Sequence, residues 1–153
     1  MDFRFNEIRE NNDLKQYAVA KLINETATNY QKIETEVANI KLKKLNLYCN
    51  VFKCSMDYAA NLTNKITYSN ITPIDNIDKL VMSERLSIIE KEQNMKPYQM
   101  AQFLGIVKTT YYEYKNINSK NLIQTLMVKK ISATWGYSMD WIVGRSQQKF
   151  IKH

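Results

Sequence analysis

The feature that most constrains this 153-residue chain is a repeat of its own pattern at an offset of 81 positions. A repeat of this size indicates two units of the same kind, and it has to be recognised before single helices or strands are assigned. Residues 55–58, Ser-Met-Asp-Tyr, recur as Ser-Met-Asp-Trp at 138–141, an offset of 83. The residues that recur at 81 are Arg4, Ile8, Lys15, Tyr17, Ala20 and Tyr30, matched by Arg85, Ile89, Lys96, Tyr98, Ala101 and Tyr111.

The two offsets differ because the second copy carries a two-residue insertion, which we expect in a loop. The copies span about residues 3–63 and 83–146. We therefore predict one domain at 1–64, a connector at 65–82, and a second domain at 83–153 with a short C-terminal tail. Pro73 and several asparagines mark the connector. Its isoleucines and Tyr68 predict that it packs against a domain.

Apolar residues recur three and four positions apart within each copy, which is the period of a helix. Glycine and proline are scarce, at three and two residues, so the frequent tight turns of a β-sandwich are not expected. The predicted fold class is therefore all-α. We expect Ser83 to cap the first helix of the second copy, and Asp2 the first helix of the first copy.

The inventory of chemically active side chains argues against an enzyme. His153 is the only histidine and the last residue, so neither a histidine-based triad nor a histidine zinc site can be assembled. The three glycines stand far apart, which disfavours a phosphate-binding loop. We expect no catalytic residue, metal or cofactor, and we interpret Cys49 and Cys54 as reduced thiols in the core.

Charge and hydropathy limit the kinds of partner that the chain is expected to have. The chain contains no apolar run of about 18 residues and no segment of signal-peptide type, so we expect a cytoplasmic protein that does not enter a membrane. Its net charge of +7 is typical of proteins with a polyanionic partner. The abundance of Lys, Asn, Ile and Tyr offers a second explanation, because an AT-rich genome supplies these residues regardless of function.

Each copy meets three local requirements of a helix-turn-helix, in which the second of two helices enters the major groove. A small residue is needed where the helices cross, and Ala20 and Ala101 occupy that position. The turn needs a residue that tolerates positive φ, and Asn24 and Gly105 stand there. The second helix needs apolar anchors, which we assign to Tyr30 with Ile33 and to Tyr111 with Tyr114.

Both copies resemble the lambda-repressor/Cro-like, or XRE-type, helix-turn-helix family. The family pattern reads roughly R-x-x-x-[LI], then [LT]-Q-x-x-[LV]-A-x-x-[LI]-G, a recognition helix ending in [IL]-E, and a last segment S-[LM]-D-[YW]. The first copy follows it from Arg4 to Tyr58 without a gap, and the second from Arg85 to Gly144 with the insertion. The resemblance implies two tandem five-helix, lambda-repressor-like DNA-binding domains.

The resemblance also implies which residues contact DNA, at the start of each recognition helix and one turn further. In the first copy, Gln16 corresponds to the family's phosphate-binding glutamine and Thr26 is expected to cap the recognition helix. In the second copy, Val107 loses that cap and Pro97 replaces the glutamine. The full predicted set is Gln16, Thr26, Ala27, Thr28, Asn29, Lys32, Lys108, Thr109, Thr110, Tyr112, Glu113 and Lys120.

Two residues of the second recognition helix leave alternatives open. Glu113 can accept a hydrogen bond from a cytosine amino group, but it would be repelled by phosphate. Tyr112 either contacts the backbone of DNA or covers the protein surface.

The net charge is divided unequally between the copies. Residues 1–64 hold nine Lys and Arg against eight Asp and Glu, whereas residues 83–153 hold eleven against five. We expect the lysines of the second copy to line a DNA backbone. These are Lys108, Lys115, Lys120, Lys129 and Lys130. Motif chemistry thus favours the first copy for DNA contact, and charge favours the second.

Together these features predict a transcriptional regulator that binds double-stranded DNA, with repression as its expected action. Two unlike recognition helices in one chain would then imitate the two-fold dimer formed by simple repressors. In the alternative, one copy binds DNA and the other mediates homodimerisation or captures a partner regulator. Val107 and Tyr112, which are apolar or aromatic at groove positions, motivate that alternative.

Overall fold

The computed structural model describes residues 3–153, which form ten α-helices and contain no β-strand beyond one isolated antiparallel bridge between Tyr137 and Phe150. The predicted all-α class is confirmed. The helices are α1 (Phe5–Asn11), α2 (Gln16–Leu22), α3 (Ala27–Glu34), α4 (Leu42–Phe52), α5 (Met56–Ala59), α6 (Lys79–Glu92), α7 (Pro97–Leu104), α8 (Lys108–Lys115), α9 (Thr125–Trp135) and α10 (Met139–Val143).

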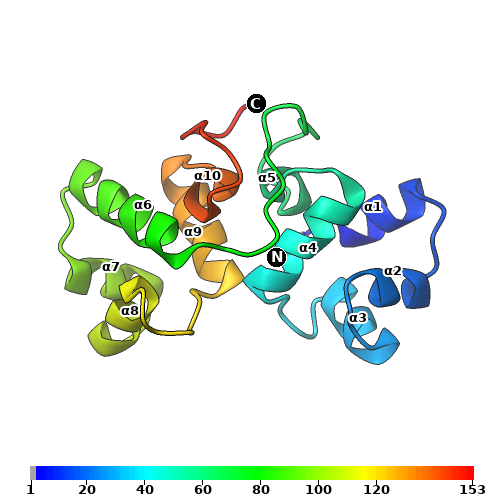
Figure 1. The fold of residues 1–153 in the computed structure, drawn as a ribbon, viewed down its shortest axis with the longest axis horizontal. Helices are drawn as coiled ribbons and strands as arrows, with labels where there is room; N and C mark the ends of the chain where they lie inside the picture. Colours follow the sequence, from blue (N-terminus) through cyan, green and yellow to red (C-terminus); the bar gives the residue numbers. More distant parts are fainter. Residues whose placement is uncertain (1–2) are drawn as a thin grey trace.

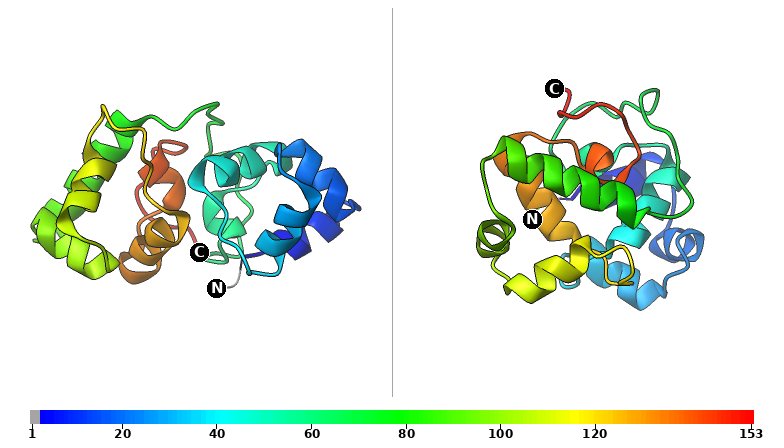
Figure 2. Two further views of the ribbon diagram at one scale, coloured as in Figure 1. Left: turned by 90° about the horizontal axis from the view of Figure 1, so that it is seen from below. Right: turned by 60° about the vertical axis from the view of Figure 1, so that its left-hand side comes forward.

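The helices form two groups of five that lie side by side (Figures 1 and 2). Helices α4, α5, α9 and α10 meet at the centre, whereas α2–α3 and α7–α8 lie toward opposite ends. Helices α7 and α8 begin 81 positions after α2 and α3, and α9 and α10 begin 83 positions after α4 and α5. The two additional residues therefore lie in residues 116–124, between α8 and α9, and the prediction of a loop insertion is confirmed.

The start of α6 differs from the prediction. This helix begins at Lys79, within the segment 65–82, and the Asp78 carboxylate accepts a hydrogen bond from the Leu80 amide at 2.9 Å. The prediction that Ser83 caps this helix is therefore wrong. The helix begins about one turn before Ser83, because Met82 is buried as part of it. Asp2 lies outside the described residues, and the residue that precedes α1 is Arg4.

The repeated arginine and the repeated aromatic residue pack against each other within each group. The Arg4 guanidinium lies 4.7 Å from the centre of the Tyr58 ring, and that of Arg85 lies 5.1 Å from the centre of the Trp141 ring. Such cation–π contacts contribute about 0.5–1 kcal/mol at partly exposed sites. They join α5 to the residue that precedes α1, and α10 to α6.

The two groups are joined by a reciprocal contact between Asp57 and Asp140. The Asp57 carboxylate accepts hydrogen bonds from the Ser138 hydroxyl at 2.6 Å and the Met139 amide at 2.7 Å. The Asp140 carboxylate accepts from the amides of Met56 at 2.9 Å and Asp57 at 3.2 Å. Each aspartate thus satisfies amide groups at the start of the opposite group's last helix, which no intrahelical partner reaches.

Arg145 completes this centre, and its side chain is fully buried. Its Nε donates to the Asp140 carboxylate at 3.0 Å, and its Nη1 donates to the side-chain oxygens of Asn46 at 2.6 Å and Asn50 at 2.5 Å. Nη2 donates to the Cys54 carbonyl at 3.3 Å. A residue that follows α10 therefore binds three positions in and after α4. We name Asp57, Asp140 and Arg145 the central polar cluster.

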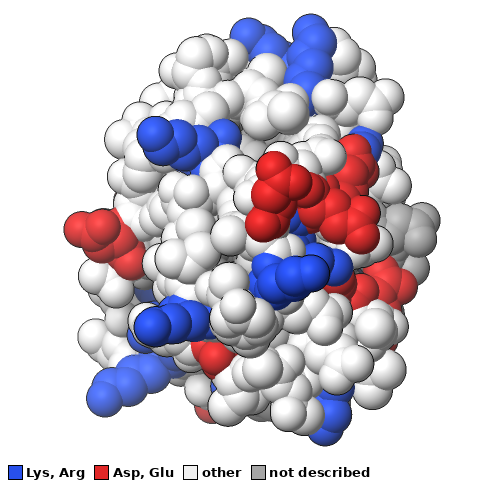
Figure 3. All heavy atoms as spheres, turned by 90° about the vertical axis from the view of Figure 1, so that its right-hand side faces the viewer, with Lys and Arg blue, Asp and Glu red and all other residues white. Residues whose placement is uncertain are grey.

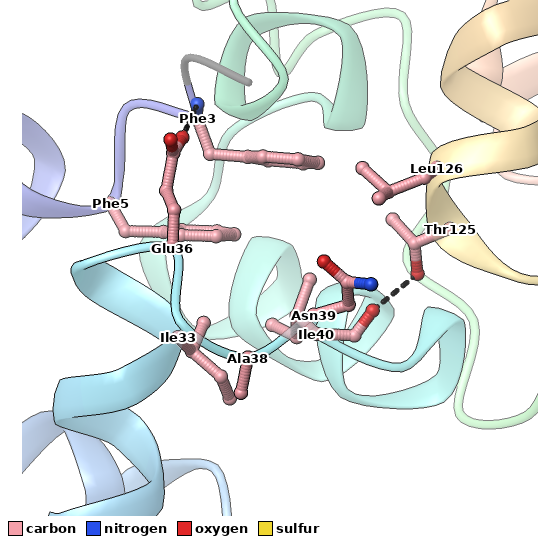
Figure 4. A pocket seen from close by; sticks show the side chains of 9 residues that line it. All are labelled: Phe3, Phe5, Ile33, Glu36, Ala38, Asn39, Ile40, Thr125 and Leu126. Carbon is pink, nitrogen blue, oxygen red and sulfur yellow. Dashed lines mark hydrogen bonds between the residues drawn. The ribbon is translucent and has the colours of Figure 1, made fainter.

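Further contacts surround the central polar cluster. The Thr125 hydroxyl donates to the Ile40 carbonyl at 2.6 Å, beside a small crevice where Phe3 and Phe5 stack with ring centres 5.0 Å apart (Figure 4). The connector also packs on the helices, because the Asn46 and Asn50 side chains both donate to the Ile74 carbonyl. The prediction that the connector packs against a domain is confirmed.

Cys49 and Cys54 are buried free thiols, as predicted. Burial and the neighbouring Cys54 raise the pKa of the Cys49 thiol well above its ordinary value, so it stays protonated. Within residues 3–153, no helix is long and apolar enough to cross a bilayer.

We expect Asp140→Ala to lower the free energy of unfolding by about 3 kcal/mol, because it leaves the buried Arg145 without its carboxylate partner. Urea denaturation followed by circular dichroism measures the change. Asp75→Ala, at an exposed position of the connector, serves as the control and should change stability by less than about 0.5 kcal/mol. A loss below about 1 kcal/mol for Asp140→Ala would contradict this assignment.

Candidate nucleic-acid interface

Helices α2 and α3, and likewise α7 and α8, are each joined by a tight turn. Asn24 has a φ of 56° and Gly105 a φ of 73° in these turns, so the predicted positive φ is confirmed at both positions. Ala20 and Ala101 are each 1% exposed. Their small side chains allow the two helices of each pair to pack closely.

The second helix of each pair is anchored by the predicted residues, because Tyr30, Ile33, Tyr111 and Tyr114 are all buried. An ion pair adds to this anchor. The Arg9 guanidinium binds the Glu34 carboxylate, with an Nη2–Oε1 distance of 2.8 Å, and thereby joins α1 to α3.

The same positions in the second group carry the opposite charges. Glu90 and Lys115 lie 81 positions after Arg9 and Glu34, and their charged atoms are 2.9 Å apart. The Tyr111 hydroxyl also donates to the Glu90 carboxylate. Both groups therefore fix the second helix of the pair with an ion pair at matching positions and of reversed polarity, which sequence comparison alone did not reveal.

The environment of these buried groups shifts their titration. Burial opposes ionisation of Glu34, but hydrogen bonds from Arg9 and Gln16 outweigh it and lower the pKa of this carboxyl. Burial and the Glu34 carboxylate raise the pKa of Tyr30, and burial with Glu90 raises the pKa of Tyr111. The Arg9–Glu34 ion pair consequently persists at neutral pH.

The start of α3 presents small polar side chains to solvent. The Thr26 hydroxyl accepts a hydrogen bond from the Asn29 amide at 3.1 Å, so the predicted cap is confirmed. Thr26, Ala27, Thr28 and Lys32 are exposed and Asn29 is half-buried. These five predicted residues share the first two turns of α3.

Gln16, the first residue of α2, lies next to α3 and donates to the Glu34 carboxylate at 3.3 Å. An open hollow lies between the starts of α2 and α3. Sequence reasoning missed two of the residues that line it, the exposed Tyr17 and Gln31. Only the folded structure shows that these two side chains are exposed at this hollow.

The start of α8 differs in chemistry. Val107 precedes the helix, is 65% exposed and makes no side-chain cap, as predicted. Lys108 and Thr109 are exposed, Thr110 is half-buried, and the Lys108 ammonium lies 5.6 Å from the centre of the exposed Tyr112 ring. The start of α8 therefore presents a lysine and an aromatic ring, where the start of α3 presents threonine, alanine and asparagine.

Three lysines expected to line DNA have other partners. Lys115 pairs with Glu90, Lys129 lies over the Phe3 ring, and Lys130 donates to the Phe103 carbonyl. Lys108, the first residue of α8, and Lys120, in the loop after α8, are exposed. Acidic and basic side chains intermingle on the end of the molecule that bears α1 (Figure 3).

A groove of about 620 Å³ runs between the two groups of helices. Thr110, Glu113 and Lys120 line it from the second group, and Lys41 and Lys43 from the first. Sequence reasoning assigned no role to Lys41 or Lys43, because only the packing of α4 against the second group brings them near α8. We name this hollow the central groove.

Comparison with known proteins bears on the first group of helices. Residues 6–58 match the family model described as Helix-turn-helix, a range that contains α2, α3 and their turn. No curated protein and no solved structure matches the chain significantly.

The reversed ion pairs lead to a test by charge exchange. We expect Arg9→Glu to lower the free energy of unfolding by about 3 kcal/mol, because it places two carboxylates together at a partly buried site. Adding Glu34→Lys recreates the polarity found at Glu90 and Lys115, and should recover more than half of the loss. Chemical denaturation of both single variants and the double variant measures the coupling. Additive losses would contradict a direct pairing.

Proposed function

We propose that this chain is a sequence-specific regulator of transcription that binds double-stranded DNA through α3 and α8. The observation that carries the proposal is the pair α2–α3, which lies in the segment that matches a helix-turn-helix family. The start of α3 presents the exposed side chains of Thr26 and Thr28. Thr28, Asn29 and Lys32 offer donors and acceptors for base edges and phosphates. Gln16 and Thr26 lie beside them at the starts of α2 and α3.

The second part of the proposal is that α6–α10 form a second DNA-binding domain of the same kind. Matching helix starts, the turn at Gly105 and the reversed ion pair at matching positions support it. The site residues here are Lys108, Thr109, Thr110, Tyr112 and Glu113, with Lys120 in the following loop. Two domains in one chain then imitate the dimer of simple repressors, with half-sites about 34 Å apart.

Thr28 and Thr109 are identical, but the other exposed positions of α3 and α8 differ, with Ala27 against Lys108, Gln31 against Tyr112 and Lys32 against Glu113. The two half-sites should therefore differ in sequence. We further propose that the protein represses transcription. Occupancy of a promoter is enough for repression, and it requires nothing beyond tight and specific binding.

One observation favours a different role for the second group. Tyr98, Val107 and Tyr112 are 44%, 65% and 45% exposed around the start of α8. Aromatic side chains such as those of Tyr98 and Tyr112 are enriched at protein–protein interfaces. In this alternative, α3 alone reads DNA, and α8 binds a second copy of the chain or a partner regulator.

Selection from a random duplex library at about 150 mM salt tests the proposal, because phosphate contacts alone do not suffice at that ionic strength. We expect a motif with two unlike parts, bound by one chain per duplex. A motif with a single part would support the alternative, and no enrichment would contradict DNA reading altogether.

Paired substitutions then assign each helix. We expect Thr28→Ala with Lys32→Ala, and Lys108→Ala with Thr109→Ala, each to weaken binding to the selected duplex about 10-fold or more. Fluorescence anisotropy measures affinity, and sedimentation measures assembly. If the change at Lys108 and Thr109 left affinity intact but abolished self-association or partner capture, α8 would be an interaction helix.

A further inference from the structure

The second group of helices departs from the first in two places, and the fold brings these places together. Helix α6 begins at Lys79, seven residues before Leu86, the counterpart of the first residue of α1. The loop 116–124 between α8 and α9 is two residues longer than its counterpart 35–41. Figure 1 shows the start of α6 directly beside this loop.

Lys79 joins the two departures. Its ammonium donates to the carbonyls of Glu113 at 2.9 Å, Ser119 at 2.9 Å and Asn121 at 2.7 Å. A lysine has three donors, so all of them are used. The contact with the Glu113 carbonyl also places a positive charge in the last turn of α8, which favours the helix end. Lys79 thus holds the loop 116–124 against α8.

The loop in turn holds the side chain of Glu113. The Asn121 amide donates to Glu113 Oε2 at 2.9 Å, whereas Glu113 Oε1 has no hydrogen-bond partner anywhere in residues 3–153. Glu113 is exposed, and it lies four positions after Thr109 and therefore on the same face of α8. One carboxylate oxygen is hydrogen-bonded within the protein, and the other has no protein partner in the described residues.

The charge of Glu113 also sets what it can bind on DNA. A carboxylate is repelled by phosphates, but it accepts a hydrogen bond from the exocyclic amino group of cytosine in the major groove. Lys41, Lys43 and Lys120 line the same central groove and offset the negative charge. A side chain that a hydrogen bond already orders loses less conformational entropy on binding, which favours the base that fits its existing position.

We propose that Lys79 and Asn121 are positioning residues that hold the Glu113 carboxylate for one cytosine of the second half-site. This inference rests on the proposed function, since it requires α8 to enter a major groove. It assigns a purpose to both departures from the repeat, because the early start of α6 supplies Lys79 and the longer loop supplies Asn121. The second half-site is then read by an element that the first group does not possess.

Selection from a random duplex library, with the full chain, tests the inference. The wild type should enrich cytosine at one position of the second half-site. Asn121→Ala should reduce that preference about 10-fold and leave the first half-site unchanged. Asn121→Gln keeps an amide donor and should retain most of the preference. Asn118→Ala, at an exposed asparagine of the same loop, is the matched control and should change nothing.

Two further variants sharpen the test. Glu113→Gln should shift the preferred base at that position from cytosine toward adenine, because an amide pairs with the donor and acceptor of adenine. Lys79→Met should weaken the cytosine preference as Asn121→Ala does. Circular dichroism and thermal unfolding of each variant verify that the fold is intact.

The outcomes separate the two proposals. A two-part wild-type motif whose cytosine preference survives Asn121→Ala would overturn the positioning role. A fall in affinity that is equal for all sequences would also overturn it, because a merely structural role predicts that result. A wild type that selects no motif would overturn the proposed function and this inference together.

Discussion

The arrangement of the two groups of helices depends on the central polar cluster. Two carboxylates and one guanidinium are buried there, and each buried charge costs several kcal/mol unless it is paired and hydrogen-bonded. Asp57 and Asp140 offset that cost by accepting amide groups at the start of α10 and α5, and Arg145 binds Asp140 directly. A small displacement of one group against the other would break several of these bonds at once. The cluster therefore defines one relative placement, where an apolar contact would tolerate sliding.

This placement determines how α3 and α8 stand relative to each other. Helices α4, α5, α9 and α10 form the centre, so the two tight helix pairs lie on either side of the central groove (Figure 1). Because both pairs belong to one chain, their association does not depend on protein concentration, in contrast to that of a dimer. Burial and the nearby Asp140 carboxylate raise the pKa of Asp57 well above its ordinary value. The contribution of the Asp57 carboxyl to stability is therefore greatest at low pH, and it falls as the pH rises through the raised pKa of this carboxyl.

The positive charge of the chain is used in two different ways. Lys115, Lys129, Lys130 and Arg145 stabilise the fold by binding a carboxylate, an aromatic ring or a carbonyl. Lys41, Lys43, Lys108 and Lys120 face solvent around α8 and the central groove. The excess of positive charge in residues 83–153 consequently overstates the basic surface of the second group. A count of charges cannot make this distinction, because it depends on which side chains meet across helices.

Local features of the chain were enough to determine the helices, the two turns and the anchors of α3 and α8. Helical periodicity, the tolerance of Asn24 and Gly105 for positive φ and the capping hydroxyl of Thr26 act within a few residues, so a sequence displays them directly. The start of α6 was misjudged at Ser83, because burial of Met82 extends that helix. Only tertiary structure decided that Arg145 is an interior residue, that Arg9–Glu34 and Glu90–Lys115 are equivalent pairs, and that Lys79 and Asn121 meet Glu113. These interactions join residues up to 99 positions apart, and their energy depends on distances that close only when the helices pack against one another.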